Sequence, residues 1–456
     1  MNRQQAHGGG FIVSGTHSGA GKTTVTVSLI RQLREAGVDV QPFKLGPDFI
    51  DTAYLSQAAG RRAINLDLWM MGAEGVRRSF RTASEDADIA VIEAMGALHD
   101  GTDGTGHGSA AHLAKLLGLP ILIVVDVAGM TRTAAAILTG LIAFDPAVEI
   151  AGIVLNRVGS SKHAEMVMQG LPRELRELVW GAIPRDDELE ISERHLGLLT
   201  VEENDARRSS LAAAHRRAGG HLDIQRAVRL GRNRASKESK TPQPELGPTA
   251  RLAIARDRAF CFYYEENLRR LSEAGFELVP FQPTVDRRLP PDVDAAYIGG
   301  GYPESFAAEL AANRSLAEEL RARTAAGMPL YAECGGLLYL ARSLTGFDGS
   351  RHEMAGVLPL DIAMDREYLA ISYVKARTTT SSPLGPAGTE ARGQEFHQSR
   401  VTSSEIDAAL YELTASDGQT RRDGFVQGSV VASYVHLHFA SAPEVPTALA
   451  EAAKAA

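Results

Sequence analysis

The chain has 456 residues, of which 44% are hydrophobic and 23% charged, a length that exceeds one hydrophobic core and predicts two globular domains. Its net charge of −8 argues against a nucleic-acid partner held through phosphates. No apolar run approaches the roughly 20 residues that span a bilayer, and the N-terminus lacks a signal-peptide pattern, so we expect a cytoplasmic protein without a membrane partner. The two cysteines, Cys261 and Cys334, cannot form a disulfide framework and show no paired metal-ligand spacing.

Short apolar runs alternate with amphipathic stretches in the first half of the chain, which predicts βαβ units and a parallel sheet. The strands that we expect there are 11–15, 87–95, 120–127 and 150–158. A polar, basic and Pro-containing stretch at 216–250 is typical of a linker, and a second α/β pattern follows it, with strands at 251–257, 276–281, 295–300 and 329–334. We therefore predict a first domain at 1–215, a linker at 216–250 and a second domain at 251–456.

A glycine-rich turn joins the first predicted strand to a helix, in the sequence GTHSGAGKTT. Such a turn points backbone N–H groups inward, and the helix N-terminus and a lysine add positive charge, so the segment is typical of a phosphate-binding loop. Its spacing is one residue longer than G-x4-GK-[ST], because Thr16 is inserted after Gly15. The residues that we expect to bind the nucleotide phosphates here are Gly19, Gly21, Lys22, Thr23 and Thr24.

Acidic residues follow two further strands and predict a Mg²⁺ site beside this loop. Thr23 would supply a hydroxyl, as the phosphate-loop hydroxyl does elsewhere. Mg²⁺ commonly takes one or two protein carboxylates and shares the rest of its sites with phosphate and water, and we favour Glu93 and Asp48. Asp51 is equally well explained as the cap of a following helix. Lys44, in FKLGPD, is the best candidate to contact the terminal phosphate of ATP or the reacting carboxylate.

Cys334 lies in PLYAECGGLLYL, where an apolar strand meets a Gly-Gly pair and an apolar helical run. This pattern predicts a strained turn that presents a nucleophile at a helix N-terminus, where a thiolate is favoured. The N–H of Gly335 and that of Gly300 or Gly301, of which we choose Gly301, would stabilise an oxyanion. A buried cysteine by itself is more often a small core residue, but histidines in the strand VVASYVHLHF could supply the base that activates the thiol.

A series of blocks in order along the chain resembles one family, the cobyrinic or hydrogenobyrinic acid a,c-diamide synthases of vitamin B12 biosynthesis. The blocks are GTHSGAGKTT, PFKLGPDFID, NLDLWM, VIEAMGALHDG, VLNRVGS, IPRDDELEISERHLGL, AFCFYYEENLRRL, IGGGYPE, AECGGLLYL, GQEFHQS and ASYVHLHF. The resemblance implies an α/β protein with a P-loop, dethiobiotin synthetase-like parallel-sheet domain that binds ATP, followed by a class I glutamine amidotransferase α/β domain.

The resemblance also implies the reaction. ATP would phosphorylate a carboxylate of a corrin ring acid, Cys334 would release ammonia from glutamine, and ammonia would displace phosphate to give an amide on the c and then the a acetate side chain. Such enzymes need Mg²⁺, with ATP and glutamine as co-substrates, and a protected route for ammonia. Whether the ring carries cobalt is left open, as is the oligomeric state, with a homodimer as one option.

The resemblance assigns roles to further residues. His436, at the first histidine of the Tyr-Val-His block, is chosen over His438 as the base. A class I triad usually has Glu two residues after that histidine, where this chain has His438, so the group that orients His436 is left open. Asn156 resembles an adenine-reading position. Candidates for the corrin carboxylates, which could equally serve domain packing, are Arg185, Arg194, His195 and Tyr302.

Two positions depart from the family pattern. Gln394 replaces a common histidine in GQEFHQS, and His99 replaces an aromatic residue in VIEAMGALHDG, so neither receives a role.

Two other functions compete with this interpretation. One alternative is an a,c-diamide synthase for another tetrapyrrole, such as nickel-sirohydrochlorin. The other is a P-loop ATPase whose glutaminase-like domain only binds, which predicts an unreactive Cys334.

Overall fold

The structure is a computed structural model, and it describes residues 9–189, 193–194, 197–198, 208–232, 248–407 and 409–456. The chain divides into two compact units, Met1–Thr241 and Pro242–Ala456, which are described separately below. Within the described residues, no helix is both long and apolar enough to cross a membrane.

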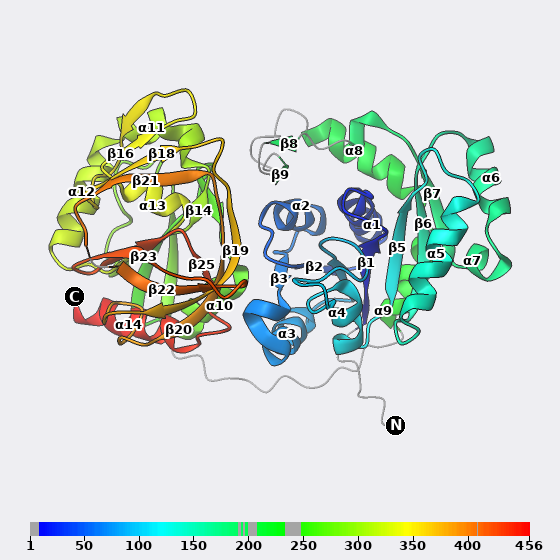
Figure 1. Ribbon diagram of the computed structural model, residues 1–456, viewed down its shortest axis with the longest axis horizontal. Helices are drawn as coiled ribbons and strands as arrows, with labels where there is room; N and C mark the ends of the chain where they lie inside the picture. Colours follow the sequence, from blue (N-terminus) through cyan, green and yellow to red (C-terminus); the bar gives the residue numbers. More distant parts are fainter. Residues whose placement is uncertain (1–8, 190–192, 195–196, 199–207, 233–247, 408) are drawn as a thin grey trace. The chain divides into compact units, whose positions relative to one another are not determined.

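A seven-stranded sheet, parallel throughout, forms the centre of the first unit (Figure 1). In sheet order its strands are β3 (Ile64–Leu66), β2 (Val40–Leu45), β4 (Ile89–Glu93), β1 (Gly10–Gly15), β5 (Ile121–Asp126), β6 (Ile150–Val158) and β7 (Val179–Pro184). All residues of β1, β2 and β4 are buried, as expected for parallel strands that helices cover on both faces. The four strands predicted for this half of the chain are therefore confirmed.

Helices connect these strands and cover the sheet. They are α1 (Lys22–Glu35), α2 (Ile50–Ala59), α3 (Leu68–Ser84), α4 (Ala110–Leu117), α5 (Thr133–Phe144), α6 (Ser161–Gly170), α7 (Arg173–Glu177), α8 (Arg208–Gly219) and α9 (Ile224–Arg232). A short 3₁₀ turn lies at Asp187–Leu189, and β8 (Glu193–Arg194) pairs with β9 (Gly197–Leu198).

Helix α9 and the end of α8, from Arg216 on, fall within the stretch that the sequence predicted as a linker, but both helices belong to the first unit. On α8, His215 is buried and its Nδ1 lies 3.0 Å from Ser28 Oγ on α1. The Arg216 carbonyl accepts a hydrogen bond from Gln32 Nε2 at 3.1 Å. The predicted linker thus begins too early in the sequence. The many basic residues on the outer faces of these two short helices made the stretch read as polar, although each helix also has apolar residues that are buried.

A ten-stranded mixed sheet forms the centre of the second unit. In sheet order its strands are β12 (Phe276–Phe281), β10 (Ala250–Ala255), β13 (Ala295–Ile298), β15 (Leu330–Glu333), β24 (Val430–Ser433), β23 (Thr420–Gln427), β22 (Ala409–Ala415), β19 (Ala370–Thr378), β20 (Glu390–His397) and β25 (His436–His438). The first five are parallel to one another, and the pairs from β24 to β25 are antiparallel. The four strands predicted for this half of the chain are present.

Smaller elements complete the second unit. Its helices are α10 (Glu265–Glu273), α11 (Ala307–Ala312), α12 (Arg314–Ala325), α13 (Gly335–Leu340) and α14 (Glu444–Ala455), with a 3₁₀ turn at Pro303–Phe306. A four-stranded sheet holds β17 (Arg351–Glu353), β16 (Ser343–Thr345), β18 (Leu360–Met364) and β21 (Ser399–Ser404), and β11 (Phe260–Phe262) pairs with β14 (Gly300–Gly301). Both units are thus α/β folds, as the sequence predicted.

Candidate active sites

The glycine-rich turn of the first unit leads from the end of β1 to the start of α1. Gly21 has a φ of 90°, and a Cβ there would lie 2.1 Å from Nδ2 of Asn156, so only glycine fits. Asn156, on β6, donates from Nδ2 to the carbonyl of Ala20 at 2.9 Å. The neighbouring Arg157 donates from Nη1 to the Gly19 carbonyl at 2.9 Å. Two residues of β6 therefore hold the turn in place. The adenine-reading role of Asn156 stays a prediction.

Lys22, Thr23 and Thr24 form the first turn of α1, where backbone N–H groups have no carbonyl partner within the helix. Lys22 is buried and donates from Nζ to the His17 carbonyl at 3.2 Å. Burial lowers the pKa of Lys22, and the charge of Lys44 lowers it further. A mobile cation and a helix N-terminus thus lie at one turn, the arrangement that binds phosphate groups in other proteins.

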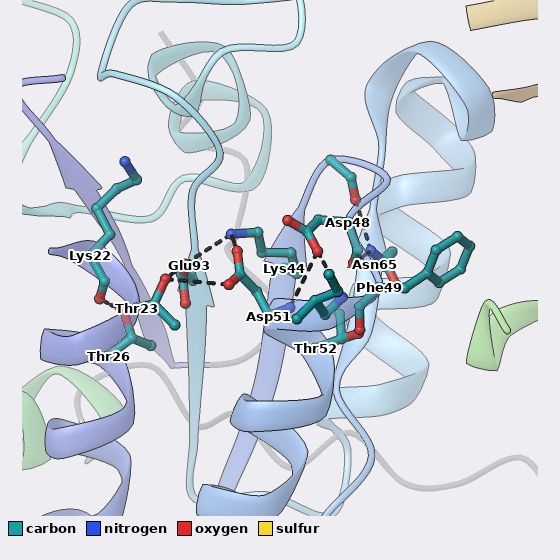
Figure 2. A network of polar contacts seen from close by, with 12 residues as sticks. Lys22, Thr23, Thr26, Lys44, Asp48, Phe49, Asp51, Thr52, Asn65 and Glu93 are labelled. Atoms are coloured by element: carbon teal, nitrogen blue, oxygen red, sulfur yellow. Dashed lines mark hydrogen bonds and ion pairs between the residues drawn. The ribbon is translucent and has the colours of Figure 1, made fainter. Parts of the chain in front are cut away.

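Beside this turn, a buried lysine near the end of β2 bridges the carboxylates of Glu93, at the end of the adjacent strand β4, and of Asp51 on α2 (Figure 2). Lys44 on β2 lies opposite Glu93 on β4 in the parallel register, and its Nζ donates to Glu93 Oε1 at 2.8 Å and to Asp51 Oδ2. Thr23 donates from Oγ1 to the same Glu93 oxygen at 2.8 Å and lies 3.4 Å from Asp51 Oδ1. The network joins the first turn of α1 to β2, β4 and α2.

Charge balance in this network is unusual because Lys44, Asp51 and Glu93 are all buried. Burial raises the pKa of Glu93 to about 7, although Lys44 opposes this effect. Burial, followed by the charge of Asp51, raises the pKa of Asp48 to about 6. For Lys44, burial lowers the pKa, but Asp51 and Glu93 outweigh it and hold the pKa above its usual range. The network therefore holds one buried cation between two carboxylates.

Asp48 and Asp51 take positions that differ from those the sequence favoured. Asp48 Oδ1 accepts hydrogen bonds from the N–H groups of Ile50 at 2.8 Å and of Asp51 at 3.2 Å, so Asp48 caps α2. The capping role that the sequence left open for Asp51 thus falls to Asp48, and Asp51 joins Thr23 and Lys44 instead. The D-x-x-D spacing held this signal, because the first carboxylate can cap a helix whose first turn contains the second.

The donor set fits a metal that takes few protein ligands. Glu93 Oε2 is buried and has no hydrogen-bond partner among the described residues, which leaves one carboxylate oxygen for a cation. The described part of the chain contains no group of three or more His, Cys, Asp or Glu side chains arranged to hold a metal by themselves. A hydroxyl and a single carboxylate oxygen suit Mg²⁺, which keeps several sites for water and phosphate.

In the second unit, Cys334 lies in a strained turn between β15 and α13. It has a φ of 47° and a ψ of −101°, a region that residues with a side chain rarely adopt. Its N–H donates to the carbonyl of Ser433 on β24 at 2.7 Å, which fixes the turn against the neighbouring strand. The strained turn predicted from the sequence is thus present, and it presents the thiol at a helix N-terminus.

Gly335 and Gly301, the two predicted oxyanion donors, lie side by side. A Cβ on Gly335 would lie 2.9 Å from the backbone nitrogen of Gly301, and Gly301 itself has a φ of 154°. Gly335 begins α13, where its N–H has no helical partner. Two backbone N–H groups therefore lie next to Cys334, the arrangement that stabilises a developing oxyanion. Their role in catalysis stays a prediction.

The two histidines of β25 have different surroundings. Burial by itself lowers the pKa of His436, but its interactions with Cys334 and then with Glu333 raise it to about 10. Burial lowers the pKa of His438 to about 4, and its ring lies 4.9 Å from that of Tyr264. Of the two, His436 is the histidine whose pKa the thiol influences, and its role as the base stays a prediction.

The remaining named residues lie in varied places. Arg185 forms an ion pair with Asp187 at 3.3 Å between exposed side chains, and Tyr302 packs edge-on against Phe262. His195 and the side chain of Arg194 lie outside the described residues. Gln394 lies opposite His436 across β20 and β25, and His99 Nε2 lies 3.0 Å from the Leu141 carbonyl. Roles in binding a corrin acid stay predictions for all four candidates.

The strain at Cys334 leads to a stability prediction. Cys334→Gly is expected to be more stable than Cys334→Ala by about 1 kcal/mol, because glycine adopts positive φ without cost while alanine keeps the strain. The difference would be measured as the free energy of unfolding, taken from the urea transition of the second unit. Equal stabilities, or a more stable alanine variant, would show that the turn is not strained.

Comparisons with known proteins agree with this two-part description. The family model described as CobQ/CobB/MinD/ParA nucleotide binding domain matches residues 11–199. The model described as CobB/CobQ-like glutamine amidotransferase domain matches residues 251–444. The first range contains the phosphate-loop network, and the second contains Cys334 and His436.

Whole-length relatives share one name, cobyrinate a,c-diamide synthase. That of Syntrophotalea carbinolica is 40% identical over 446 residues, which cover 95% of this chain and 96% of the relative. That of Caldanaerobacter subterraneus subsp. tengcongensis is 37% identical and covers 94% of both chains. That of Synechocystis sp. is 39% identical, covering 94% of this chain and 90% of the relative. The similarity thus extends over both units.

Proposed function

The chain belongs to the family of cobyrinate a,c-diamide synthases, which are glutamine-hydrolysing, amide-forming ligases, and from this membership we propose that it amidates the a and c acetate carboxylates of a corrin ring acid. The proposed substrate is cobyrinic or hydrogenobyrinic acid, and the proposed compartment is the cytoplasm. The observation that supports the proposal best is the presence, in one chain, of a phosphate-loop network around Lys44 and Glu93 and of a thiol next to a buried histidine.

The first unit would activate the carboxylate. The carboxylate oxygen attacks the γ-phosphorus of ATP, and the bond from that phosphorus to the β-bridging oxygen breaks. ADP is released, and the substrate carboxylate becomes an acyl phosphate. The N–H groups of the phosphate loop and the Lys22 ammonium would bind the transferred phosphoryl group and neutralise its charge. Lys44, released from one carboxylate partner, would contact the terminal phosphate or the reacting carboxylate.

Mg²⁺ would be held by Thr23 and Glu93. Asp48 is the second carboxylate ligand proposed from the sequence, and Asp51 lies in the same network as Thr23 and Glu93. When bound, it supplies positive charge to the terminal phosphates. Glu93 Oε2 has the free acceptor capacity that this role requires.

The second unit would supply ammonia. The Cys334 thiolate attacks the carboxamide carbon of glutamine, the N–H groups of Gly335 and Gly301 stabilise the oxyanion, and protonated His436 gives its proton to the departing ammonia. Water then hydrolyses the glutamyl thioester to glutamate and restores the thiol. Ammonia attacks the acyl carbon of the acyl phosphate, and inorganic phosphate leaves to give the amide.

A mass-spectrometric assay tests the proposal. The protein is incubated with ATP, Mg²⁺ and glutamine, and cobyrinic acid, hydrogenobyrinic acid and nickel-sirohydrochlorin are compared as acceptors. We expect two successive replacements of OH by NH₂ on a corrin acid, with glutamate, ADP and phosphate formed in step. Amidation of nickel-sirohydrochlorin alone would support the other tetrapyrrole, and ATP hydrolysis without any amide would support an ATPase with a binding domain.

A further inference from the structure

Glu333, the residue immediately before the thiol, lies next to the base. It ends β15, and its Oε2 is 3.7 Å from Nδ1 of His436. Both side chains are only 2% exposed, so water screens this charge pair little. The sequence analysis assigns no role to Glu333 and leaves open the group that orients His436.

Three donors fix the Glu333 carboxylate in place. Tyr297 donates from its hydroxyl to Oε2 at 2.7 Å, and Tyr331 donates to Oε1. The N–H of Leu437 donates to Oε1 at 2.9 Å, which ties the carboxylate to the strand that carries His436. Burial and the nearby Glu333 charge raise the pKa of both tyrosines well above the usual value, so both hydroxyls remain donors. An acceptor with bonds at both oxygens is what an ionised carboxylate provides.

Other groups around His436 do not offer this charge. His438 stands where a class I triad usually has its acid, and burial lowers its pKa to about 4, so it is neutral near pH 7. His397 on β20 is likewise kept neutral, because burial lowers its pKa to about 4. Gln394, opposite His436 in the sheet, is uncharged, and Gly300 lies so close that a Cβ there would be 2.3 Å from Cε1 of the ring.

We propose that Glu333 is the positioning acid of the thiol site, holding Nδ1 of His436 and leaving the other ring nitrogen to exchange a proton with Cys334. This inference rests on the glutaminase function proposed above. The thiol proton moves to His436 and then to the departing ammonia, while the Glu333 carboxylate compensates the imidazolium charge throughout. The acid thus comes from the strand before the nucleophile instead of the strand of the base, a change of origin that keeps the same chemical role.

The change Glu333→Gln tests this role, because it keeps the shape and removes the charge. We expect kcat for glutamine hydrolysis to fall about 10²-fold or more, with KM for glutamine changed less than about 3-fold. Since the raised pKa of His436 keeps its ring protonated up to about pH 10, loss of Glu333 should move the alkaline limb of the pH profile to lower pH. Compared with Glu333→Gln, Glu333→Asp should have a higher kcat and an alkaline limb closer to that of the wild type.

Glu266→Gln is the matched control, because Glu266 is an equally buried glutamate of the same unit that pairs with Arg270 at 2.9 Å. It should leave the pH limb in place. Should Glu333→Gln fail to fold, Glu333→Asp and Tyr297→Phe, which removes one donor to Oε2, are expected to shift the same limb by smaller amounts. If the folded Glu333 variants kept the alkaline limb at the same pH as the wild type, the inference would be overturned.

Failure of the inference and failure of the proposed function give different results. If the wild-type protein hydrolyses no glutamine, the glutaminase function itself is wrong. If the wild type is active and Cys334→Ser is inactive, but the Glu333 variants keep the wild-type rate and pH profile, only the role of Glu333 is wrong. Ammonium-supported amide formation, measured in the same preparations, should be unchanged in every Glu333 variant.

Discussion

Cys334→Ser is expected to lower glutamine-supported amide formation by at least about 10³-fold while ammonium-supported formation continues at the wild-type rate. The reason is that a serine hydroxyl is a far weaker nucleophile than a thiolate, whereas added ammonia bypasses the thiol. Both rates are measured as amide product per minute by mass spectrometry, one with glutamine and one with an ammonium salt. A glutamine-analogue trap should label Cys334 in the wild type.

The chain offers a matched control in its other cysteine. Cys261 lies on β11 and is half-buried, and Cys261→Ser should keep both activities. Loss of both activities in Cys334→Ser would show that the two half-reactions are not separable as proposed. Full glutamine-supported activity in that variant, or no labelling of Cys334 in the wild type, would remove the proposed source of ammonia.

Lys22→Ala should remove glutamine-supported and ammonium-supported amide formation alike, each by at least about 10³-fold, because ATP must activate the carboxylate in either case. Lys22 begins α1 and its Nζ already reaches back over the turn to the His17 carbonyl, the position from which it would meet a phosphate group. Glutamine hydrolysis measured alone should persist, because it needs no phosphoryl transfer.

Lys115→Ala serves as the control for the loss of a lysine. Lys115 is on α4, and its side chain is partly exposed and pairs with Asp145 at 2.5 Å, so its removal should leave both activities unchanged. Substantial ammonium-driven turnover by Lys22→Ala would overturn the assignment of the phosphate loop, even if the glutamine-supported rate were low.

Prediction from sequence worked where the local backbone geometry depends on a short contiguous segment. The loop GTHSGAGKTT and the turn AECGGLLYL both have the geometry expected of them, because glycines at fixed offsets dictate the local backbone. His436 was chosen over His438 from the resemblance. Its ring interacts with Cys334, and its role as the base stays a prediction. The acidic pair was harder, since the sequence could not tell which of Asp48 and Asp51 caps α2.

Glu333 shows what the sequence pattern missed. A glutamate at the end of the apolar strand PLYAEC was itself a signal, because a buried charge requires a partner. Its partner His436 is about a hundred positions away, and the Leu437 N–H that also binds it is separated from it by 104 residues. Spacing rules describe neighbours along a helix or strand and do not reach such distances.

The amino-acid sequence alone determined the α/β class of both units, the glycine-rich turn before α1, the strained turn at Cys334 and the family, since each depends on local backbone preferences or on ordered motifs. Tertiary structure decided which side chains share a site: Lys44 between Asp51 and Glu93, Asn156 against the phosphate loop, and Glu333 beside His436. The physical reason is that parallel strands bring residues distant in sequence to one sheet edge. Burial at that edge then fixes the charge of each group, and no single segment of the sequence contains that information.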